Sequence, residues 1–457
     1  MAPLLSTGGL AEVASALPRA LHAQEHDVRV VMPCYKRVPT EHRGESYCMC
    51  VAQLGAKTVH GALRKSKAPG SEIPLYLVEH GGYFDRPEPY GEGGGAYTDN
   101  LERFCFFCQA VLHGMPQTGW IPDVIHCHDW QTAPVIIYLK SGHASGAAWN
   151  GVPTVFTIHN LAYQGRFGPN EYGVTGFDRS LFHGECLEYH GDLNLMKGAI
   201  ALVDRINTVS PRYAREIQLP DYGSGLDGML QRHRDHLSGI LNGVDYSVWN
   251  PKTDRHIAAN YDRSDLSGKA VCKAALQRRF GLPVSNRPLF GMVSRFTWQK
   301  GTDLLAAALD DILTMDLQIA LLGTGEPGLE HALVQAAQRH PEKLGVVLAF
   351  NPELSHQVQA GSDFFLMPSR YEPCGLSQLF SLAYGTVPIV RRTGGLVDTV
   401  RDINPVHLQR GDATGIAFVP STPQALTRAV RRAVELYAGV NLLATVRRKG
   451  MAEDFSW

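Results

Sequence analysis

The chain has 457 residues, of which 44% are hydrophobic, and a formal net charge of −1 at neutral pH. This length predicts more than one domain, at roughly 150 residues each, and the apolar content suffices for sizeable cores. The balanced charge argues against nucleic acid or an anionic membrane surface as the main partner, and no apolar run is long enough to span a bilayer. The nine cysteines are an odd number scattered through apolar segments, which predicts reduced thiols and a cytoplasmic protein.

In the first half of the chain, short apolar runs that are typical of strands alternate with helical patterns. The expected strands are residues 28–32, 75–78, 124–127, 154–157 and 205–209. This alternation predicts parallel sheets covered by helices. Cys105 and Cys108 have a metal-like spacing, as do Cys48 and Cys50. A helical apolar pattern surrounds the first pair, so we favour core cysteines over a zinc site.

His126 and His128 flank Cys127 at the end of the third expected strand. Because side chains alternate along a strand, both imidazoles should lie on one face of the sheet. A metal site there would need further ligands that the sequence does not indicate, and we predict none.

The alternation pauses over residues 242–287, which are polar and rich in Asp, Asn and Pro. We therefore predict a domain boundary near residue 243, with one domain over 1–243 and a second over 244–457. Two Rossmann-like α/β domains facing a cleft, with the site between them, are the natural architecture for this pattern.

The strand pattern resumes in the second domain. The expected strands are residues 289–293, 317–322, 346–350, 364–367 and 387–390. The first of them leads into a loop that carries Arg295 and Lys300. Two cations in one strand-to-helix loop can neutralise a diphosphate leaving group without a metal. The alternative is a pair of ordinary surface cations.

Residues 323–328 read Gly-Thr-Gly-Glu-Pro-Gly and fit the G-x-G-x-x-G pattern between a strand and a helix. This match is the strongest argument for an NAD-dependent oxidoreductase. However, the next expected strand ends in Phe350 and Asn351 instead of the acidic residue that binds a ribose. The oxidoreductase is therefore the weaker interpretation.

The most informative stretch is 369–378, which lies between a buried strand and an apolar helical run. Pro373 and Gly375 are suited to a tight turn there, and Ser377 is a plausible N-cap. Backbone N–H groups at such a helix start attract phosphate. Glu372 comes just before them, where a sugar attached to a diphosphate would meet a carboxylate. The alternative is an ordinary loop with a solvated Glu.

Two similar segments place paired glycines before an apolar helix with an acid in its first turn. One contains Gly8, Gly9 and Glu12, and the other contains Gly394 and Gly395. Paired glycines let a ligand approach the backbone closely, and an acid suits the positive end of a helix. A repeated solution to helix-on-sheet packing explains the pattern equally well.

These motifs occur together and in one order, and in this respect the chain resembles the bacterial glycogen synthase and plant starch synthase family. The segments that carry the resemblance are Thr7–Leu10, His126–Trp130, Thr157–Leu161, Tyr222–Leu226, Leu241–Asp245, Ser294–Gly301, Glu372–Leu376 and Arg392–Leu396. Many GT-B enzymes carry a second Glu eight residues after the first, whereas this chain has the aromatic Phe380, which is similar to the glycogen and starch synthase pattern. The resemblance covers nearly the whole chain.

The resemblance implies a retaining GT-B glycosyltransferase that moves glucose from ADP-glucose to the non-reducing 4-OH of an α-1,4-glucan such as glycogen. It implies no cofactor, with the first domain on the acceptor side and the second on the donor side. Arg295 and Lys300 would stabilise the leaving diphosphate, and Glu372 would hold sugar hydroxyls. His159 would contact the glucose, and Asp129 would orient donor or acceptor. The remaining donor-binding candidates are Ser6, Gly8, Gly9, Glu12, Asn160, Asn242, Cys374, Gly375, Leu376 and Ser377.

The chain departs from the family pattern at three points. The family has a buried strand and then a Lys where this chain has Ser6, and a terminal helix after the segment that ends at Trp457. Glu12 replaces the usual Asp. One alternative is therefore a truncated or degenerate homologue that binds glucan or nucleotide without full activity. A glycoside hydrolase, with Asp129 and Glu372 as its carboxylate pair, is a further alternative.

Overall fold

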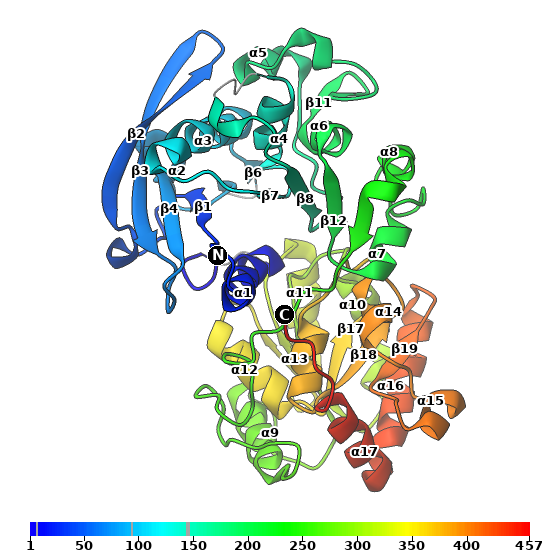
Figure 1. The fold of residues 1–457 in the computed structure, drawn as a ribbon. Coiled ribbons are helices and arrows are strands. Elements are labelled where there is room, and N and C mark those ends of the chain that lie inside the picture. The colour runs from blue at the N-terminus through cyan, green and yellow to red at the C-terminus, as the bar shows by residue number, and fades with distance from the viewer. Residues whose placement is uncertain (6–7, 93–94, 143–146) are drawn as a thin grey trace. The chain divides into compact units, whose positions relative to one another are not determined.

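The computed structural model describes residues 1–5, 8–92, 95–142 and 147–457, and it divides into two compact units, Met1–Ile240 and Leu241–Trp457 (Figure 1). No helix in this described part of the chain is both long and apolar enough to cross a membrane. Asn242, which the predicted boundary assigned to the first domain, belongs to unit 2.

In unit 1 the helices are α1 (Gly9–Ala23), α2 (Gly81–Phe84), α3 (Asn100–Gly114), α4 (Ala133–Lys140), α5 (Tyr172–Thr175), α6 (Leu195–Leu202), α7 (Pro211–Glu216) and α8 (Asp227–Arg232). The strands are β1 (Val30–Pro33), β2 (Glu45–Leu54), β3 (Lys57–Lys67), β4 (Pro74–Glu79), β5 (Gly91–Glu92), β6 (Gly95–Ala96), β7 (Ile125–His128), β8 (Thr154–Ile158), β9 (Arg166–Phe167), β10 (Glu188–Tyr189), β11 (Asp192–Asn194), β12 (Arg205–Thr208) and β13 (Leu237–Gly239).

The parallel sheet of unit 1 has the order β13-β12-β8-β7, and it contains three of the expected strands. A second sheet has the order β1-β4-β3-β2, in which β2, β3 and β4 pair antiparallel. β1 and β4 pair parallel, as predicted for these two strands, whereas the antiparallel pairs that involve β3 were not predicted. A tight hairpin joins β2 to β3 at Gly55, whose φ of 59° lies in the left-handed region that a two-residue turn requires.

In unit 2 the helices are α9 (Ser267–Arg279), α10 (Thr302–Ile312), α11 (Pro327–Arg339), α12 (Pro352–Gly361), α13 (Ser377–Ala383), α14 (Gly395–Thr399), α15 (Pro405–Arg410), α16 (Pro423–Ala438) and α17 (Val440–Gly450). The strands are β14 (Leu289–Val293), β15 (Gln318–Leu322), β16 (Leu344–Val347), β17 (Phe364–Met367), β18 (Val387–Arg391) and β19 (Ile416–Phe418).

Residues 241–457 are all described, and they form one parallel sheet of order β16-β15-β14-β17-β18-β19 with helices on both faces (Figure 1). Alternation along the strands divides the core. Ile319 and Leu321 pack in a cluster with α10, α11, α16 and α17, while Ala320 and Leu322 pack with α9, α12 and α14. Strands that are buried on both faces explain the continuous apolar runs seen in the sequence.

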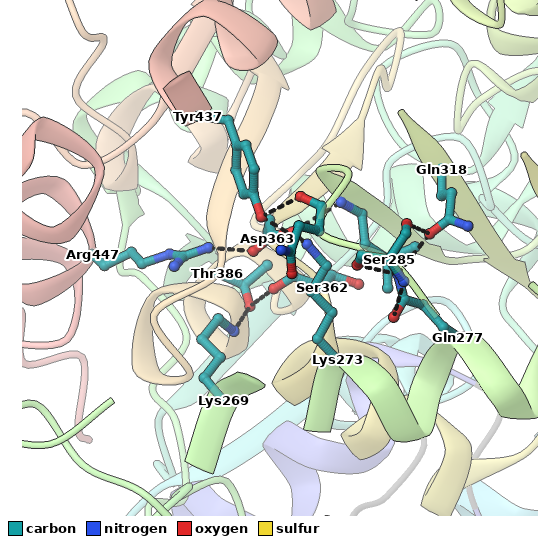
Figure 2. A network of polar contacts seen from close by, with 12 residues as sticks. Lys269, Lys273, Gln277, Ser285, Gln318, Ser362, Asp363, Thr386, Tyr437 and Arg447 are labelled. Atoms are coloured by element: carbon teal, nitrogen blue, oxygen red, sulfur yellow. Dashed lines mark hydrogen bonds and ion pairs between the residues drawn. The ribbon is translucent and has the colours of Figure 1, made fainter. Parts of the chain in front are cut away.

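A polar network lies at the amino ends of the central strands of this sheet (Figure 2). Asp363, just before β17, accepts hydrogen bonds from Lys273 Nζ at 2.7 Å, from Arg447 Nη2 at 2.6 Å and from the backbone N–H of Leu289 at 2.9 Å. Burial acts to raise the pKa of Asp363, but the charges of Arg447 and Lys273 outweigh it and hold that pKa below its ordinary value. The network thereby ties α9 and α17 to the starts of β14 and β17.

Candidate active site

The chain order of the unit 2 sheet reverses at β14. From β14 the chain moves outward through β15 and β16, and it then returns to place β17 on the other side of β14. Ligands of open α/β sheets bind at the carboxyl ends of the strands at such a switch point. The loops that follow β14 and β17 carry the cations and the carboxylate that the sequence indicated, so the fold brings the two motifs together.

Lys300 and Glu372 contact each other directly. Lys300 Nζ lies 2.9 and 2.7 Å from the two carboxylate oxygens of Glu372, and Ser369 Oγ donates to one of them at 2.9 Å. Glu372 is buried, with 5% of its surface exposed. Burial of an unpaired carboxylate is costly, and these contacts with Lys300 and Ser369 offset that cost. The sequence predicted both residues but not that they form an ion pair.

Close backbone packing shapes the loop that carries Arg295 and Lys300. Gly301 has a φ of 69°, and a Cβ there would lie 2.1 Å from the carbonyl oxygen of Pro368. Only glycine fits this approach, which brings the loop after β14 against the loop after β17. Arg295 is exposed at the start of its loop, beside the fully buried Phe296.

The turn after β17 has the expected form with one correction. Gly375 has a φ of 72°, and the side chain of Gln378 donates to the carbonyl oxygens of Cys374 and Gly375 at 3.0 Å each. Ser377 is the first residue of α13 and not its N-cap, because Leu376 occupies the cap position without a side-chain hydrogen bond. Ser377 still begins the helix directly beside the turn.

The thiol of Cys374, in this turn, forms a hydrogen bond with the backbone of Asn242. Burial raises the pKa of the Cys374 thiol to about 12, and a hydrogen bond with the backbone of Asn242 opposes the rise. A buried thiol of that kind is not a nucleophile at neutral pH. Leu376 packs with Val244 and Phe380 in a small apolar cluster, so the segment that follows residue 241 supports the turn.

The glycine pair at Gly394 and Gly395 serves the same turn. A Cβ at Gly394 would lie 1.9 Å from the carbonyl oxygen of Glu372, and one at Gly395 would lie 2.2 Å from that of Cys374. Here backbone packing accounts for both glycines. At Gly8 the described residues place no atom within 4 Å of an added Cβ, so the two similar segments differ in what they accommodate.

The G-x-G-x-x-G match at 323–328 also has a packing explanation. A Cβ at Gly323 would lie 1.9 Å from the carbonyl oxygen of Ser294, and one at Gly325 would lie 2.1 Å from that of Phe296. The carboxylate of Glu330 already accepts the N–H of Gly325 at 2.6 Å. A negative charge at that amide disfavours a pyrophosphate, which argues against the oxidoreductase.

In unit 1 the candidates lie at the carboxyl ends of the adjacent strands β7 and β8. Asp129 follows β7 with a φ of 58°, which is unusual for a residue with a side chain. Its Oδ1 accepts the backbone N–H of His159 at 2.7 Å. Burial raises the pKa of Asp129 to about 7, and hydrogen bonds from the N–H groups of His159 and Asn160 oppose this rise. The side chain of Asn160 accepts the N–H of Ala162 at 3.1 Å.

Three imidazoles gather beside Asp129. The rings of His126 and His128 stack with centroids 4.2 Å apart, which confirms that the two side chains share a face. His128 Nδ1 lies 3.0 Å from His159 Nε2. Burial, together with the nearby His126, lowers the pKa of His159 to about 3. In the described part of the chain no set of three or more His, Cys, Asp or Glu residues is arranged to hold a metal ion.

Gly9 and Glu12 lie in the first turn of α1, directly after Gly8. Ser6 lies outside the described residues.

The structure adds residues that sequence reasoning missed. Arg391, at the end of β18, donates to the carbonyl oxygens of Ser369 at 2.7 Å and of Arg370, and so supports the loop that carries Glu372. Its position at the carboxyl end of a strand beside β17 was a usable signal. His128 was seen in the sequence only as a possible metal ligand, and its contact with His159 was not foreseen.

Comparisons with known proteins agree with this architecture. Residues 1–232 match the family model of the starch synthase catalytic domain, and residues 275–449 match that of glycosyl transferases group 1. The chain is 46% identical over 458 residues to a glycogen synthase of Geotalea daltonii, and 46% identical over 465 residues to one of Thioalkalivibrio sulfidiphilus. Each alignment covers all of this chain and 94% of the relative.

Among solved structures, the catalytic domain of starch synthase IV from Arabidopsis thaliana, bound to ADP and acarbose, matches with a TM-score of 0.92 and 32% identity. That match covers all of this chain and 94% of the other. Sucrose-phosphate synthase from Thermosynechococcus elongatus shares the fold, with a TM-score of 0.60 at 18% identity over 99% of this chain and 90% of the other. The resemblance inferred from the motifs is thus confirmed, and the chain belongs to the glycogen synthase and starch synthase family of GT-B glucosyltransferases.

Proposed function

We propose that this chain transfers glucose from ADP-glucose to the non-reducing 4-OH of an α-1,4-glucan, with retention at the anomeric carbon. The observation that carries the proposal is the similarity to glycogen synthases at 46% identity across the whole chain. The relative that was solved with ADP and acarbose supports the same choice of donor and acceptor.

In unit 2, Arg295 and Lys300 stabilise the charge that develops on the diphosphate as its bond to glucose breaks. The backbone amides near Gly375, Leu376 and Ser377 assist them. Glu372 holds hydroxyls of the sugar, and its pairing with Lys300 at 2.7 Å fixes the side chain in place. The hydrogen bond between Cys374 and the backbone of Asn242 supports the turn that carries these amides.

In unit 1, His159 and Asn160 contact the glucose, and Asp129 orients donor or acceptor. The space beside Gly8 lets a ligand approach the start of α1, where Gly9 and Glu12 lie. Because cations and amides supply the charge stabilisation, we expect the reaction to need no metal ion or other cofactor. All nine cysteines are unpaired thiols, mostly buried, which supports a cytoplasmic location.

The direct test is transfer of radiolabelled glucose to glycogen from ADP-glucose and, separately, from UDP-glucose. We expect incorporation from ADP-glucose and full release of the label by an α-1,4-specific amylase, as retention requires. A parallel assay of NAD reduction should give no signal. If neither ADP-glucose nor UDP-glucose gives incorporation, the alternative of a binding homologue without full activity is favoured.

A further inference from the structure

The ring of His159 forms a hydrogen bond with the ring of a second histidine, His128. His128 is the last residue of β7, and His159 directly follows β8, the strand paired with it. Nδ1 of His128 lies 3.0 Å from Nε2 of His159. One of the two nitrogens of the His159 ring is therefore already engaged within the protein, and only Nδ1 remains to meet a substrate.

Both rings are neutral at physiological pH. Burial, with the neighbouring His126 and His159, lowers the pKa of His128 well below its ordinary value, and burial lowers the pKa of His159 to about 3. A neutral imidazole has one N–H and one acceptor nitrogen. Between two neutral rings one must donate and the other accept, so the tautomer of each ring determines that of the other.

The surroundings hold this pair in place. His128 is stacked on His126 at 4.2 Å, and His126 Nε2 lies 2.6 Å from Thr157 Oγ1. On the other side, Asp129 Oδ1 fixes the backbone of His159 through its N–H at 2.7 Å. The backbone and the ring of His159 are thus each fixed by a separate residue.

We propose that His128 is a positioning residue for glucose transfer, because its Nδ1 fixes the tautomer and the orientation of the His159 ring. Nδ1 of His159 then presents a single defined hydrogen-bonding group, either a donor or an acceptor, to a hydroxyl of the donor glucose. This inference rests on the proposed function, which assigns the contact with glucose to His159.

Matched variants separate the hydrogen bond from the packing. The amide of His128→Asn lies near the position of Nδ1 and can donate or accept, whereas His128→Gln places its amide near Nε2, and His128→Ala removes both. His26→Ala, which removes an exposed imidazole between α1 and β1, serves as the control. We expect His128→Ala and His128→Gln to lower kcat about tenfold, the loss of one hydrogen bond. We expect KM for ADP-glucose to change less than about threefold.

His128→Asn should recover most of the lost kcat, and His26→Ala should stay near the parent in kcat and in melting temperature. A purely structural role would instead lower the melting temperature of the alanine, asparagine and glutamine variants alike, with no recovery specific to asparagine. Parent-like kcat in both His128→Ala and His128→Gln would overturn the inference.

A second measurement does not depend on activity. The ¹⁵N chemical shifts of labelled imidazoles, assigned with His159→Gln, should report one neutral tautomer of His159 in the parent and in His128→Asn. A mixture of tautomers is expected in His128→Ala. An unchanged tautomer in that variant would overturn the inference even if the enzyme transfers glucose. If the parent transfers no glucose, the proposed function fails, and these shifts still decide whether His128 fixes the His159 ring.

Discussion

The contact between Lys300 and Glu372 couples two roles that the sequence treated separately. Each residue holds the other, so a change at either one alters both the sugar-binding carboxylate and the diphosphate-binding cation. We expect Glu372→Gln to lower kcat at least about 100-fold, through lost charge and a displaced Lys300. The melting temperature should fall only slightly, because Lys300 is 21% exposed and can reach solvent. Steady-state kinetics and thermal melting measure both quantities.

Glu353→Gln is a suitable control, because that carboxylate is 73% exposed and should leave kcat unchanged. The pair can also be tested by combining Glu372→Gln with Lys300→Met. If the ion pair acts as one unit, the double variant should lose about 1–3 kcal/mol less activation free energy than the sum of the single losses. Strictly additive losses would show that the two side chains act independently.

The raised pKa of Asp129 predicts a dependence of stability on pH. Because this pKa is about 7 in the folded protein and about 4 in an unfolded chain, the folded state binds more protons between these values. Stability therefore falls as pH rises from about 4 to about 7, and the full cost is present above that range. Asp129→Asn keeps an oxygen for the His159 N–H and removes this cost.

We expect Asp129→Asn to be more stable than the parent at pH 8 by about 1–4 kcal/mol, and to show no such gain at pH 4. Urea unfolding at both pH values measures the difference. A variant that is less stable than the parent at pH 8 would mean that the ionised carboxylate is well accommodated. Transfer activity should fall at pH 8, where the parent carboxylate is ionised, because the amide lacks the charge of the proposed orienting group.

At the scale of secondary-structure elements, the Asp363 network joins α9 and α17 to the amino ends of β14 and β17 (Figure 2). The candidate site of unit 2 lies at the carboxyl ends of the same strands. Asp363→Asn leaves Lys273 and Arg447 buried without their carboxylate, since both side chains are 15% exposed or less. Breaking a buried pair in this way costs about 3–5 kcal/mol. We expect that loss in urea unfolding, with kcat per folded molecule close to that of the parent.

The matched control is Asp316→Asn, which breaks the ion pair with Arg287 at a carboxylate that is 76% exposed. Surface pairs contribute about 0–1 kcal/mol, so this variant should unfold like the parent. Equal losses at Asp363 and Asp316 would contradict a special role for the buried network.

A stack of aromatic rings joins α12 and α13 to the segment after residue 241. Trp249 lies between His356 and Phe380, with ring centroids 3.8 Å from each and planes within 5°. His356 in turn contacts Asp254, Nδ1 to Oδ2, at 2.7 Å. Phe380, at the position where many related enzymes have a second Glu, packs against Trp249.

Across the whole molecule, the sequence predicted best where the signal was local. The strand over Phe364–Met367 has the predicted bounds, and the shared face of His126 and His128 followed from alternation alone. β16 begins and ends earlier than predicted, and the predicted end was too late because exposed Phe350 was counted as part of the apolar run. The pairs Lys300–Glu372 and Lys273–Asp363 join residues far apart in the chain, and no local pattern encodes such contacts.

The division of candidate residues between the two units predicts how ADP affects stability. At 100 times its dissociation constant, a ligand that binds only the folded state stabilises it by about 2.7 kcal/mol. If Arg295 and Lys300 hold the diphosphate, ADP should raise the melting temperature of the parent and of Asp129→Asn equally at a fixed concentration. The rise should be much smaller in Arg295→Ala, which loses a forked contact with phosphate oxygens.

Arg339→Ala, which removes a 57% exposed cation on α11 of the same unit, should respond like the parent. Calorimetric titration with ADP measures the dissociation constants directly. An equal loss of the ADP effect in Asp129→Asn and Arg295→Ala would mean that the nucleotide is not held mainly by the cations of unit 2.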